Sequence, residues 1–223
     1  LKEIIPTLTF PIKLIETPGV GRAKALNMAW QACSQLWVAN IDADDAWHPN
    51  KLLYQLKAIE VMPLADLIST KSKVLKGDAS PSPQVVPPFL NQLIVPLNKE
   101  DFFVRNQINH SSVLIRKNKL SEVNGYDETR ISQIDLDLWY RLLAANSNLY
   151  RVNEPLTFKR VHPGQSFEAK KRIAYCYRSM LCEYKGLRLL SAKLSWYPWP
   201  ILKFFFSLLP VGIRTKVRAI FRR

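Results

Sequence analysis

The feature that most constrains this chain is a short apolar run that leads directly into a cluster of acids. Residues 36–41 read Leu-Trp-Val-Ala-Asn-Ile, and Asp42, Asp44 and Asp45 follow within four positions. A run of this kind predicts a buried strand of a parallel sheet. In open α/β sheets, ligands bind outside the carboxyl ends of the strands. The sequence therefore places three acids where a ligand is expected.

Three neighbouring carboxylates at the end of a dry strand are unfavourable, because like charges repel and burial penalises ionisation. A divalent cation removes that penalty, and Mg²⁺ is typically held by one or two carboxylates together with substrate phosphates. The stretch therefore predicts a metal site that receives a phosphorylated ligand. The alternative is structural: Asp44 or Asp45 caps a helix that begins near Pro49. That alternative explains one aspartate well and three poorly, and both roles can coexist.

Other segments of the chain share a pattern with this stretch. These segments occur in the same order as the motifs of one enzyme family. In chain order, those motifs are a glycine, Ala-x-Asn, a strand, Asp-x-Asp-Asp and Pro-x-Lys-Leu-x-x-Gln. The chain thereby resembles family 2 glycosyltransferases, over roughly residues 11–166. The matching blocks are 19–27 (GVGRAKALN), 48–55 (HPNKLLYQ), 109–116 (NHSSVLIR), 125–127 (GYD), 135–142 (DLDLWYRL) and 158–166 (FKRVHPGQS).

The resemblance implies a fold and an activity. The fold is α/β of the GT-A type over residues 1–166, a Rossmann-like and mostly parallel sheet flanked by helices. Residues 167–223 then form a basic, amphipathic helical appendage. The activity is inverting transfer of a sugar from a nucleotide-sugar donor to a hydroxyl acceptor. Because residues 12–16 look like the family's third strand, we expect a fragment that lacks the first βαβ unit.

The donor site is expected near the start of a helix predicted over residues 22–33, with Ala25, Met28, Ala29 and Ala32 on its apolar face. Arg22 and Lys24 lie in its first turn, where cations are disfavoured unless an anion binds. The resemblance implies the donor diphosphate as that anion; solvated surface charge is the alternative. By resemblance alone, Asn27 and Asp42 belong to the donor pocket, and His110 orients a phosphate or helps to hold the metal.

The resemblance also assigns the chemistry. Asp44 and Asp45 would hold Mg²⁺ or Mn²⁺ on the diphosphate. Asp135 occupies the position of the family's catalytic base, although Ile134 stands where the family usually has glutamate. Asp137 lies two residues further on, so its side chain should point away around the helix and serve structure. The loop at residues 160–162 (Arg-Val-His) would fold over the donor.

Further elements are predicted by periodicity and by Gly and Pro positions. We expect helices over 49–61, 98–104, 117–123, 134–143 and 165–187, and strands over 65–70 and 110–116, with a strand pair within 148–160 and a hairpin arm over 71–78. The proline-rich stretch 80–96 should be a loop facing the acceptor or a passive connector.

The charge of the chain is concentrated at its end. The formal net charge is +14, and no acid follows Glu183. Nine basic residues do: Lys185, Arg188, Lys193, Lys203, Arg214, Lys216, Arg218, Arg222 and Arg223. Interleaved aromatics fit nucleic acid or an anionic membrane, and the apolar run at 204–206 favours lipid over nucleic acid. Since a span needs about 20 apolar residues, residues 201–209 should lie in the membrane interface.

These features suggest a place for the protein and leave rivals open. Three cysteines without metal-type spacing fit a reduced cytoplasmic compartment, so we expect a peripheral protein on the inner face of the cell membrane. Its acceptor would be a glycan or a lipid-linked glycan. The rivals are a nucleotidyltransferase with a similar sheet and a non-catalytic, membrane-bound module, although the intact acid cluster argues against the latter.

Overall fold

The computed structural model describes residues 11–77, 86–161, 172–210 and 212–214. A six-stranded sheet lies at its centre, in the order β1-β5-β3-β6-β2, with β4 paired to β6 off this path. The strands are β1 (Trp37–Ala39), β2 (Ala46–Trp47), β3 (Leu67–Lys76), β4 (Ile94–Pro96), β5 (Leu114–Arg116) and β6 (Leu149–Val161).

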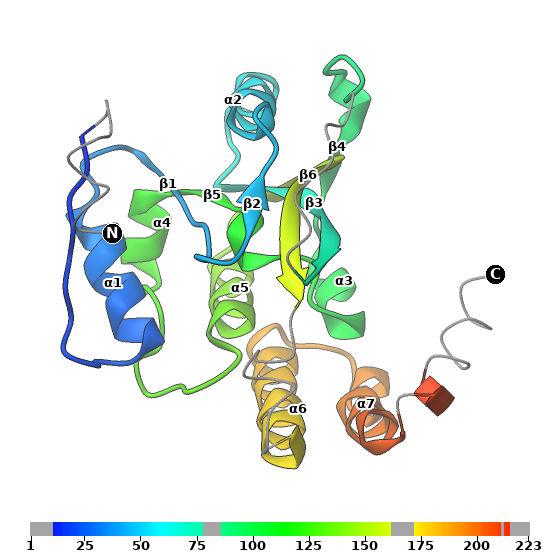
Figure 1. The fold of residues 1–223 in the computed structure, drawn as a ribbon. Helices are drawn as coiled ribbons and strands as arrows, with labels where there is room; N and C mark the ends of the chain where they lie inside the picture. Colours follow the sequence, from blue (N-terminus) through cyan, green and yellow to red (C-terminus); the bar gives the residue numbers. More distant parts are fainter. Residues whose placement is uncertain (1–10, 78–85, 162–171, 211, 215–223) are drawn as a thin grey trace.

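Helices flank this sheet on both sides (Figure 1). Helix α2 lies on one side, whereas α3 and α5 lie on the other, with α6 and α7 beyond them. The helices are α1 (Arg22–Ala32), α2 (Lys51–Val61), α3 (Lys99–Val104), α4 (Lys117–Glu122), α5 (Ile134–Ala144), α6 (Arg172–Leu189) and α7 (Pro198–Leu208). A 3₁₀ turn, η3 (His110–Ser112), precedes β5.

Alternation along the strands creates two cores. In β3, Leu67 belongs to the cluster shared with α1, α3, α5 and α6, whereas Ile68 belongs to the cluster under α2. In β6, Leu149 faces the first cluster, and Val152 faces the second. This is the two-residue period of a sheet that is covered on both faces. The α/β architecture expected from the sequence is confirmed.

The directions of the strands differ from the expected mostly parallel sheet. Only β3 and β6 run parallel among the described pairings, whereas β1–β5, β3–β5, β2–β6 and β4–β6 are antiparallel. The sheet is therefore mixed. An apolar run indicates burial and carries no information on strand direction, which depends on the partner that each strand meets. In the same way, the strand pair predicted within 148–160 is one continuous strand, β6.

Three local predictions are also wrong. Residues 12–16 form no strand in the described structure, and β1 is half-buried rather than dry. On α1 the buried face is Ala23, Asn27 and Trp30, while Ala29 and Ala32 are exposed. The hydropathy pattern does not predict this buried face, because Asn27 is a polar residue that is buried by forming hydrogen bonds.

The helices predicted over 49–61, 98–104, 117–123 and 134–143 are confirmed within two residues at each end, and α6 confirms the described part of the 165–187 helix. The 117–123 helix ends as expected at Asn124 and Gly125, both of which have positive φ. None of the helices in the described ranges is both long and apolar enough to cross a membrane. Three parts of these predictions lie outside the described residues: His162 of the donor-covering loop, residues 80–85 of the proline-rich loop, and the last basic residues (215–223).

Candidate active site at the acid turn

The three aspartates form a tight turn between β1 and β2, called the acid turn (residues 42–45) below. The backbone N–H of Asp45 donates to the Asp42 carbonyl at 3.0 Å. Arg160, near the end of β6, holds the other side: its backbone N–H donates to Asp45 Oδ1 at 2.9 Å, and its Nε donates to the Asp44 carbonyl at 3.0 Å. The structure thus gathers Asp42, Asp44 and Asp45 beside the sheet, as predicted.

Ser111 holds both flanks of the acid turn. Its hydroxyl accepts the backbone N–H of Asp42 at 3.0 Å, and its carbonyl accepts the indole N–H of Trp47 at 2.6 Å. Ser111 is fully buried in η3. No local sequence pattern predicts a role for this serine, because its contact with Asp42 spans 69 positions.

A chain of polar side chains runs from the acid turn into the protein. Arg22 Nη2 lies 2.8 Å from both carboxylate oxygens of Asp42 and 3.3 Å from His110 Nδ1. His110 Nδ1 also lies 2.9 Å from Asn40 Nδ2, and Nε2 lies 2.8 Å from the Tyr126 hydroxyl. His110 is buried, so it orients these side chains from the protein interior.

The acids of the turn differ in how readily they ionise. Burial opposes ionisation of Asp42, but the contacts with His110 and Arg22 outweigh it and lower the pKa to about 2. Burial raises the pKa of Asp45, and repulsion from Asp42 and Asp44 adds to the rise, against the hydrogen bonds from Ser111 and Arg160. Asp42 is therefore already neutralised by a cation, whereas Asp45 would gain from one.

Asn27 is fully occupied in shaping a neighbouring loop. Its Nδ2 donates to the Tyr126 carbonyl at 2.9 Å and to Glu128 at 2.8 Å, while its Oδ1 accepts the Tyr126 N–H at 2.8 Å and the Trp30 indole N–H at 2.9 Å. Two donors and two acceptor sites exhaust the amide. Asn27 thus supports the site through the loop instead of facing the donor with a free group.

The predicted base, Asp135, stands half-buried in the first turn of α5. Asn106 Nδ2 donates to its Oδ2 at 3.1 Å. Burial raises the pKa of Tyr126, and the negative charge of Asp135 adds to that rise. The charge of Asp135 thus acts on the buried Tyr126 hydroxyl, which itself contacts His110. Lys24 is exposed on α1.

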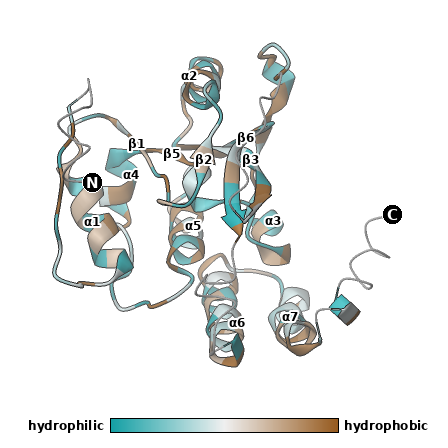
Figure 2. Ribbon diagram, in the orientation of Figure 1, coloured by the Kyte–Doolittle hydropathy of each residue, from teal (hydrophilic) through white to brown (hydrophobic). Residues whose placement is uncertain are grey.

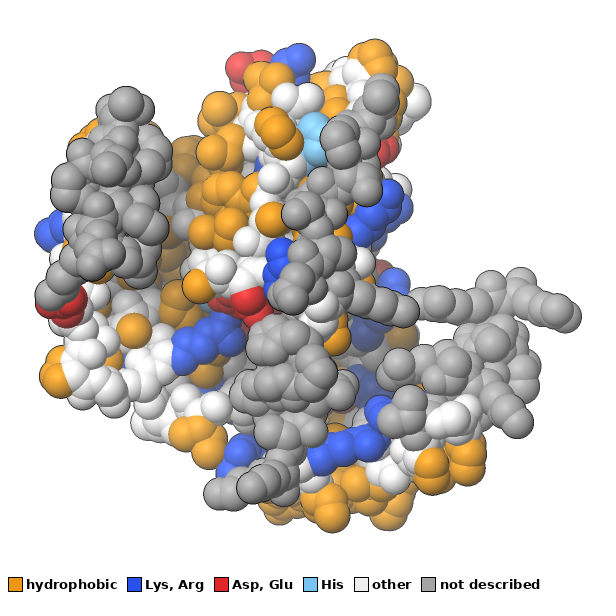
Figure 3. Space-filling view, viewed as in Figure 1, with side chains coloured by type: hydrophobic (Ala, Val, Ile, Leu, Met, Phe, Trp, Pro, Cys, Tyr) orange, Lys and Arg blue, Asp and Glu red, His pale blue; other side chains and the backbone are white. Residues whose placement is uncertain are grey.

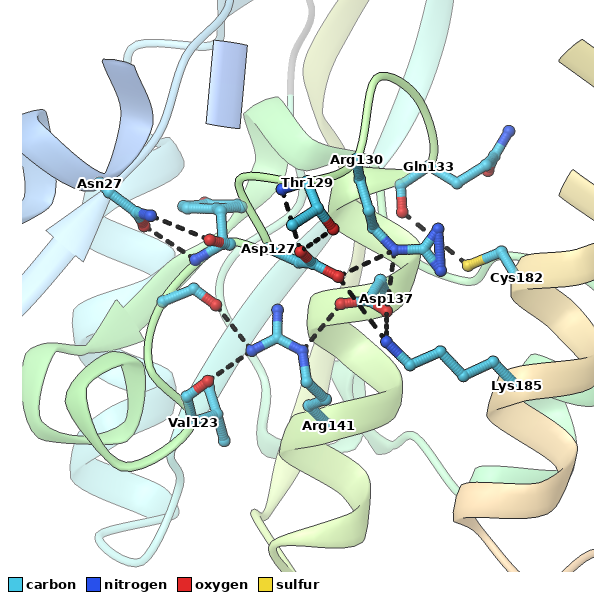
Figure 4. A network of polar contacts seen from close by, with 12 residues as sticks. Asn27, Val123, Asp127, Thr129, Arg130, Gln133, Asp137, Arg141, Cys182 and Lys185 are labelled. Carbon is cyan, nitrogen blue, oxygen red and sulfur yellow. Dashed lines mark hydrogen bonds and ion pairs between the residues drawn. The ribbon is translucent and has the colours of Figure 1, made fainter. Parts of the chain in front are cut away.

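Asp137 has the structural role predicted for it. Its buried carboxylate lies 3.0 Å from Arg130 Nε, 2.8 Å from Arg141 Nε and 3.0 Å from Lys185 Nζ (Figure 4). Arg141 also donates to the carbonyls of Val123 and Gly125. These contacts lower the pKa of Asp137 despite its burial. They fix the loop before α5, and with it the turn that carries Asp135, against α6.

The Pro-x-Lys-Leu-x-x-Gln block is a buried clamp. Lys51 Nζ donates to Gln55 Oε1 at 2.8 Å and lies 3.9 Å from the centroid of the Trp47 ring. Gln55 Nε2 donates to the carbonyls of Ile68 and Ser112. Burial lowers the pKa of Lys51 to about 7. The clamp joins α2 to β2, β3 and η3, and thus backs the acid turn from the inside.

The donor set of the acid turn fits a hard divalent cation. Asp44 and Asp45 supply carboxylate oxygens, the ligand type of Mg²⁺ and Mn²⁺. Within the described ranges, no group of three or more His, Cys, Asp or Glu side chains is placed to hold a metal by itself. Two carboxylates plus substrate phosphates are a usual set for Mg²⁺, so the residues present match an ion that arrives with a diphosphate.

Known proteins are similar to this chain in sequence and in architecture. The sequence profile of glycosyl transferase family 2 matches residues 1–114. The amylovoran biosynthesis glycosyltransferase AmsE of Erwinia amylovora is 24% identical over 174 residues, covering 76% of this chain and 59% of AmsE. An uncharacterized glycosyltransferase of Haemophilus influenzae is 29% identical over 161 residues, covering 69% of this chain and 56% of that protein. The chain thus spans less than two thirds of these relatives.

Solved structures agree on the fold. TarS of S. aureus, in complex with UDP-GlcNAc, has a TM-score of 0.59 at 13% identity and covers 93% of this chain and 68% of its own. The mannosyltransferase PcManGT of Pyrobaculum calidifontis, in complex with GDP-Man and Mn²⁺, has a TM-score of 0.53 at 16% identity, covering 90% and 59%. With the family profile matched over half of its length, and with the acid turn in a GT-A-like sheet, the chain belongs to glycosyl transferase family 2.

Proposed function

We propose that this glycosyltransferase moves a sugar from a nucleotide-sugar to a hydroxyl acceptor in one inverting displacement. The observation that carries the proposal is the acid turn, whose Asp42 is bound by Arg22 and backed by His110 and Tyr126. These contacts hold Arg22, a donor-binding group in this proposal, in a fixed position beside the acids. UDP-GlcNAc and GDP-Man in the two similar structures support a donor of this class.

Asp44 and Asp45 would hold Mg²⁺ or Mn²⁺ together with the donor diphosphate. When bound, the ion offsets the charge that develops on the leaving nucleoside diphosphate. Arg22, whose side chain is 58% exposed beside Asp42, presents a second positive charge to the same diphosphate. Lys24 is a further exposed cation of this helix turn, available to a phosphate that extends along α1.

Asp135 would take the proton of the acceptor hydroxyl as that oxygen attacks the anomeric carbon. Asn106 orients one carboxylate oxygen by its hydrogen bond, which leaves the other oxygen to accept the proton. The ion pairs of Asp137 keep the first turn of α5 in place during this step. Ile134, at the family's glutamate position, is buried, so it affects the acceptor preference more than the proton transfer.

The acceptor would be a glycan or a lipid-linked glycan in the synthesis of a cell-surface polysaccharide. Amylovoran biosynthesis, in the name of one relative, supports this class. We place the protein in the cytoplasm, peripherally on the inner face of the membrane. The basic C-terminal sequence supports that location, because anionic lipids attract juxtamembrane cations.

The test is donor turnover by the full-length protein. Incubated with a panel of nucleotide-sugars and Mn²⁺, the wild type should release nucleoside diphosphate, and EDTA should stop the release. Asp44→Asn and Asp45→Asn should weaken Mn²⁺-dependent nucleotide binding, whereas Glu60→Gln, an exposed carboxylate of α2, should not. Release of pyrophosphate from a nucleoside triphosphate and a sugar phosphate would instead establish a nucleotidyltransferase and overturn the proposal.

A further inference from the structure

Helix α7 exposes a row of large apolar side chains to solvent, while its lysine, Lys203, points toward the protein. The exposed face carries Leu202 (56% exposed), Phe205 (62%) and Leu208 (40%), with Ile201 and Leu209 beside them. Their spacing is that of one side of an α-helix. Figure 2 colours much of α7 as hydrophobic, and Figure 3 shows hydrophobic side chains gathered along the lower edge of the molecule over α6 and α7.

Lys203 and Trp199 anchor α7 to the rest of the protein. Lys203 points inward, with Nζ 2.5 Å from Glu183 Oε2 on α6 and 3.2 Å from the Val104 carbonyl at the end of α3. The indole N–H of Trp199 donates to the same carbonyl at 3.4 Å. A cation at the carboxyl end of a helix is favourable. The helix is therefore fixed with its apolar side outward, an arrangement that water alone disfavours.

The apolar surface continues onto α6. Ile173 (67% exposed), Tyr177 (49%) and Leu181 (47%) follow one another at four-residue spacing on that helix. The Tyr177 ring lies 6.5 Å from the Phe204 ring, and the Phe204 ring lies 5.5 Å from the Phe205 ring. These rings connect the α6 stripe to the outer face of α7, so the two helices present one apolar surface, called the α6–α7 face below.

We propose that the α6–α7 face inserts into the interfacial layer of an anionic membrane, with Leu202 and Phe205 as its principal inserted side chains. This inference rests on the membrane location proposed above and names the surface that would achieve it. Charge selects lipid over a second copy of the chain: no acid follows Glu183, while nine basic residues do. Two such cationic segments repel one another, whereas anionic headgroups attract each of them.

The experiment compares matched pairs of exposed apolar residues in the full chain. Leu202→Ser/Phe205→Ser alters the α6–α7 face. Leu53→Ser/Leu56→Ser alters α2, where the exposed fractions are similar, 48% and 52%. Sedimentation with phosphatidylglycerol-containing vesicles measures binding, and thermal unfolding confirms that each variant folds. Donor turnover is not used as a readout. Failure of the membrane proposal would therefore leave the sugar-transfer proposal unaffected, and failure of the sugar-transfer proposal would leave the membrane proposal unaffected.

We expect wild type and the α2 variant to bind anionic vesicles equally. The α7 variant should bind at least about tenfold more weakly, because two exposed apolar side chains no longer enter lipid. Equal binding by all three proteins would overturn the proposal in favour of the basic sequence alone. Equal loss of vesicle binding in both variants would overturn the proposal, because it would show that any exposed apolar residues contribute to binding. A wild-type dimer that becomes monomeric only in the α7 variant, without vesicle binding, would assign the face to a second copy.

Discussion

The guanidinium of Arg22 lies 2.8 Å from both carboxylate oxygens of Asp42, so the first turn of α1 is fastened to the acid turn. The sequence predicted that Arg22 would meet a bound anion. In the structure its partner is a carboxylate of the protein, and its side chain remains 58% exposed. Arg22 can therefore neutralise Asp42 and still present charge to an incoming diphosphate.

Arg22→Gln should weaken Mn²⁺-dependent binding of nucleoside diphosphate by about tenfold, the size of one charge-assisted hydrogen bond. The unpaired charge of Asp42 would then repel the diphosphate. The free energy of unfolding should change by less than about 1 kcal/mol, because the ion pair is largely exposed. Titration calorimetry and denaturant unfolding measure the two quantities. A large loss of stability with unchanged nucleotide binding would show that the pair is only structural.

Ser111→Ala should affect stability and nucleotide binding together. It removes the acceptor of the Asp42 N–H, which costs about 1–3 kcal/mol when the donor is left unpaired, and it frees the acid turn to shift. Ser112→Ala is the matched control, because Ser112 is equally buried but donates to the Asn109 carbonyl at 2.7 Å. The control should lose stability and retain nucleotide affinity. Equal affinity in the two variants would remove Ser111 from the positioning of the turn.

The sequence identifies the parts of the site that depend on local pattern. The acid turn follows from an apolar run that ends in aspartates, and the structural role of Asp137 follows from helical spacing. Ser111 and Tyr126 were not predicted as contacts, because each meets its partner across a long sequence separation. Asn27 was assigned to the donor, whereas burial and four hydrogen bonds give it a supporting place.

The fold was predictable in its elements and less so in its sheet. Helix ends such as Asn124 and Gly125 carry a local signal, since they adopt positive φ. The direction of a strand carries none: β5 contains only Leu114–Arg116 and runs antiparallel to both β1 and β3. The orientation of α7 could not be predicted from the sequence either, because only its contacts show that Lys203 points inward.

Lys51 should make stability depend on pH. Burial lowers its folded pKa to about 7, below the value in the unfolded chain, so the unfolded state binds more protons between about pH 7 and pH 10. Stability from this group therefore rises with pH across that window, by up to about 1.4 kcal/mol per pH unit. Urea unfolding at pH 7.0 and 8.5 should show the rise in wild type and not in Lys51→Met. The same slope in both proteins would assign it to other groups.

The most direct test of the account is a pair of carboxylate variants of the full-length enzyme, measured for turnover and for binding. Asp135→Asn should lower kcat for nucleotide-sugar turnover by on the order of 10²–10⁴-fold, the usual size of general-base catalysis, and should leave Mn²⁺-dependent nucleotide binding nearly intact. Asp137→Asn should instead lower the free energy of unfolding, because it removes the buried carboxylate that Arg130, Arg141 and Lys185 share. Near-normal turnover by Asp135→Asn, or loss of its nucleotide binding, would contradict the assignment of Asp135 as the base.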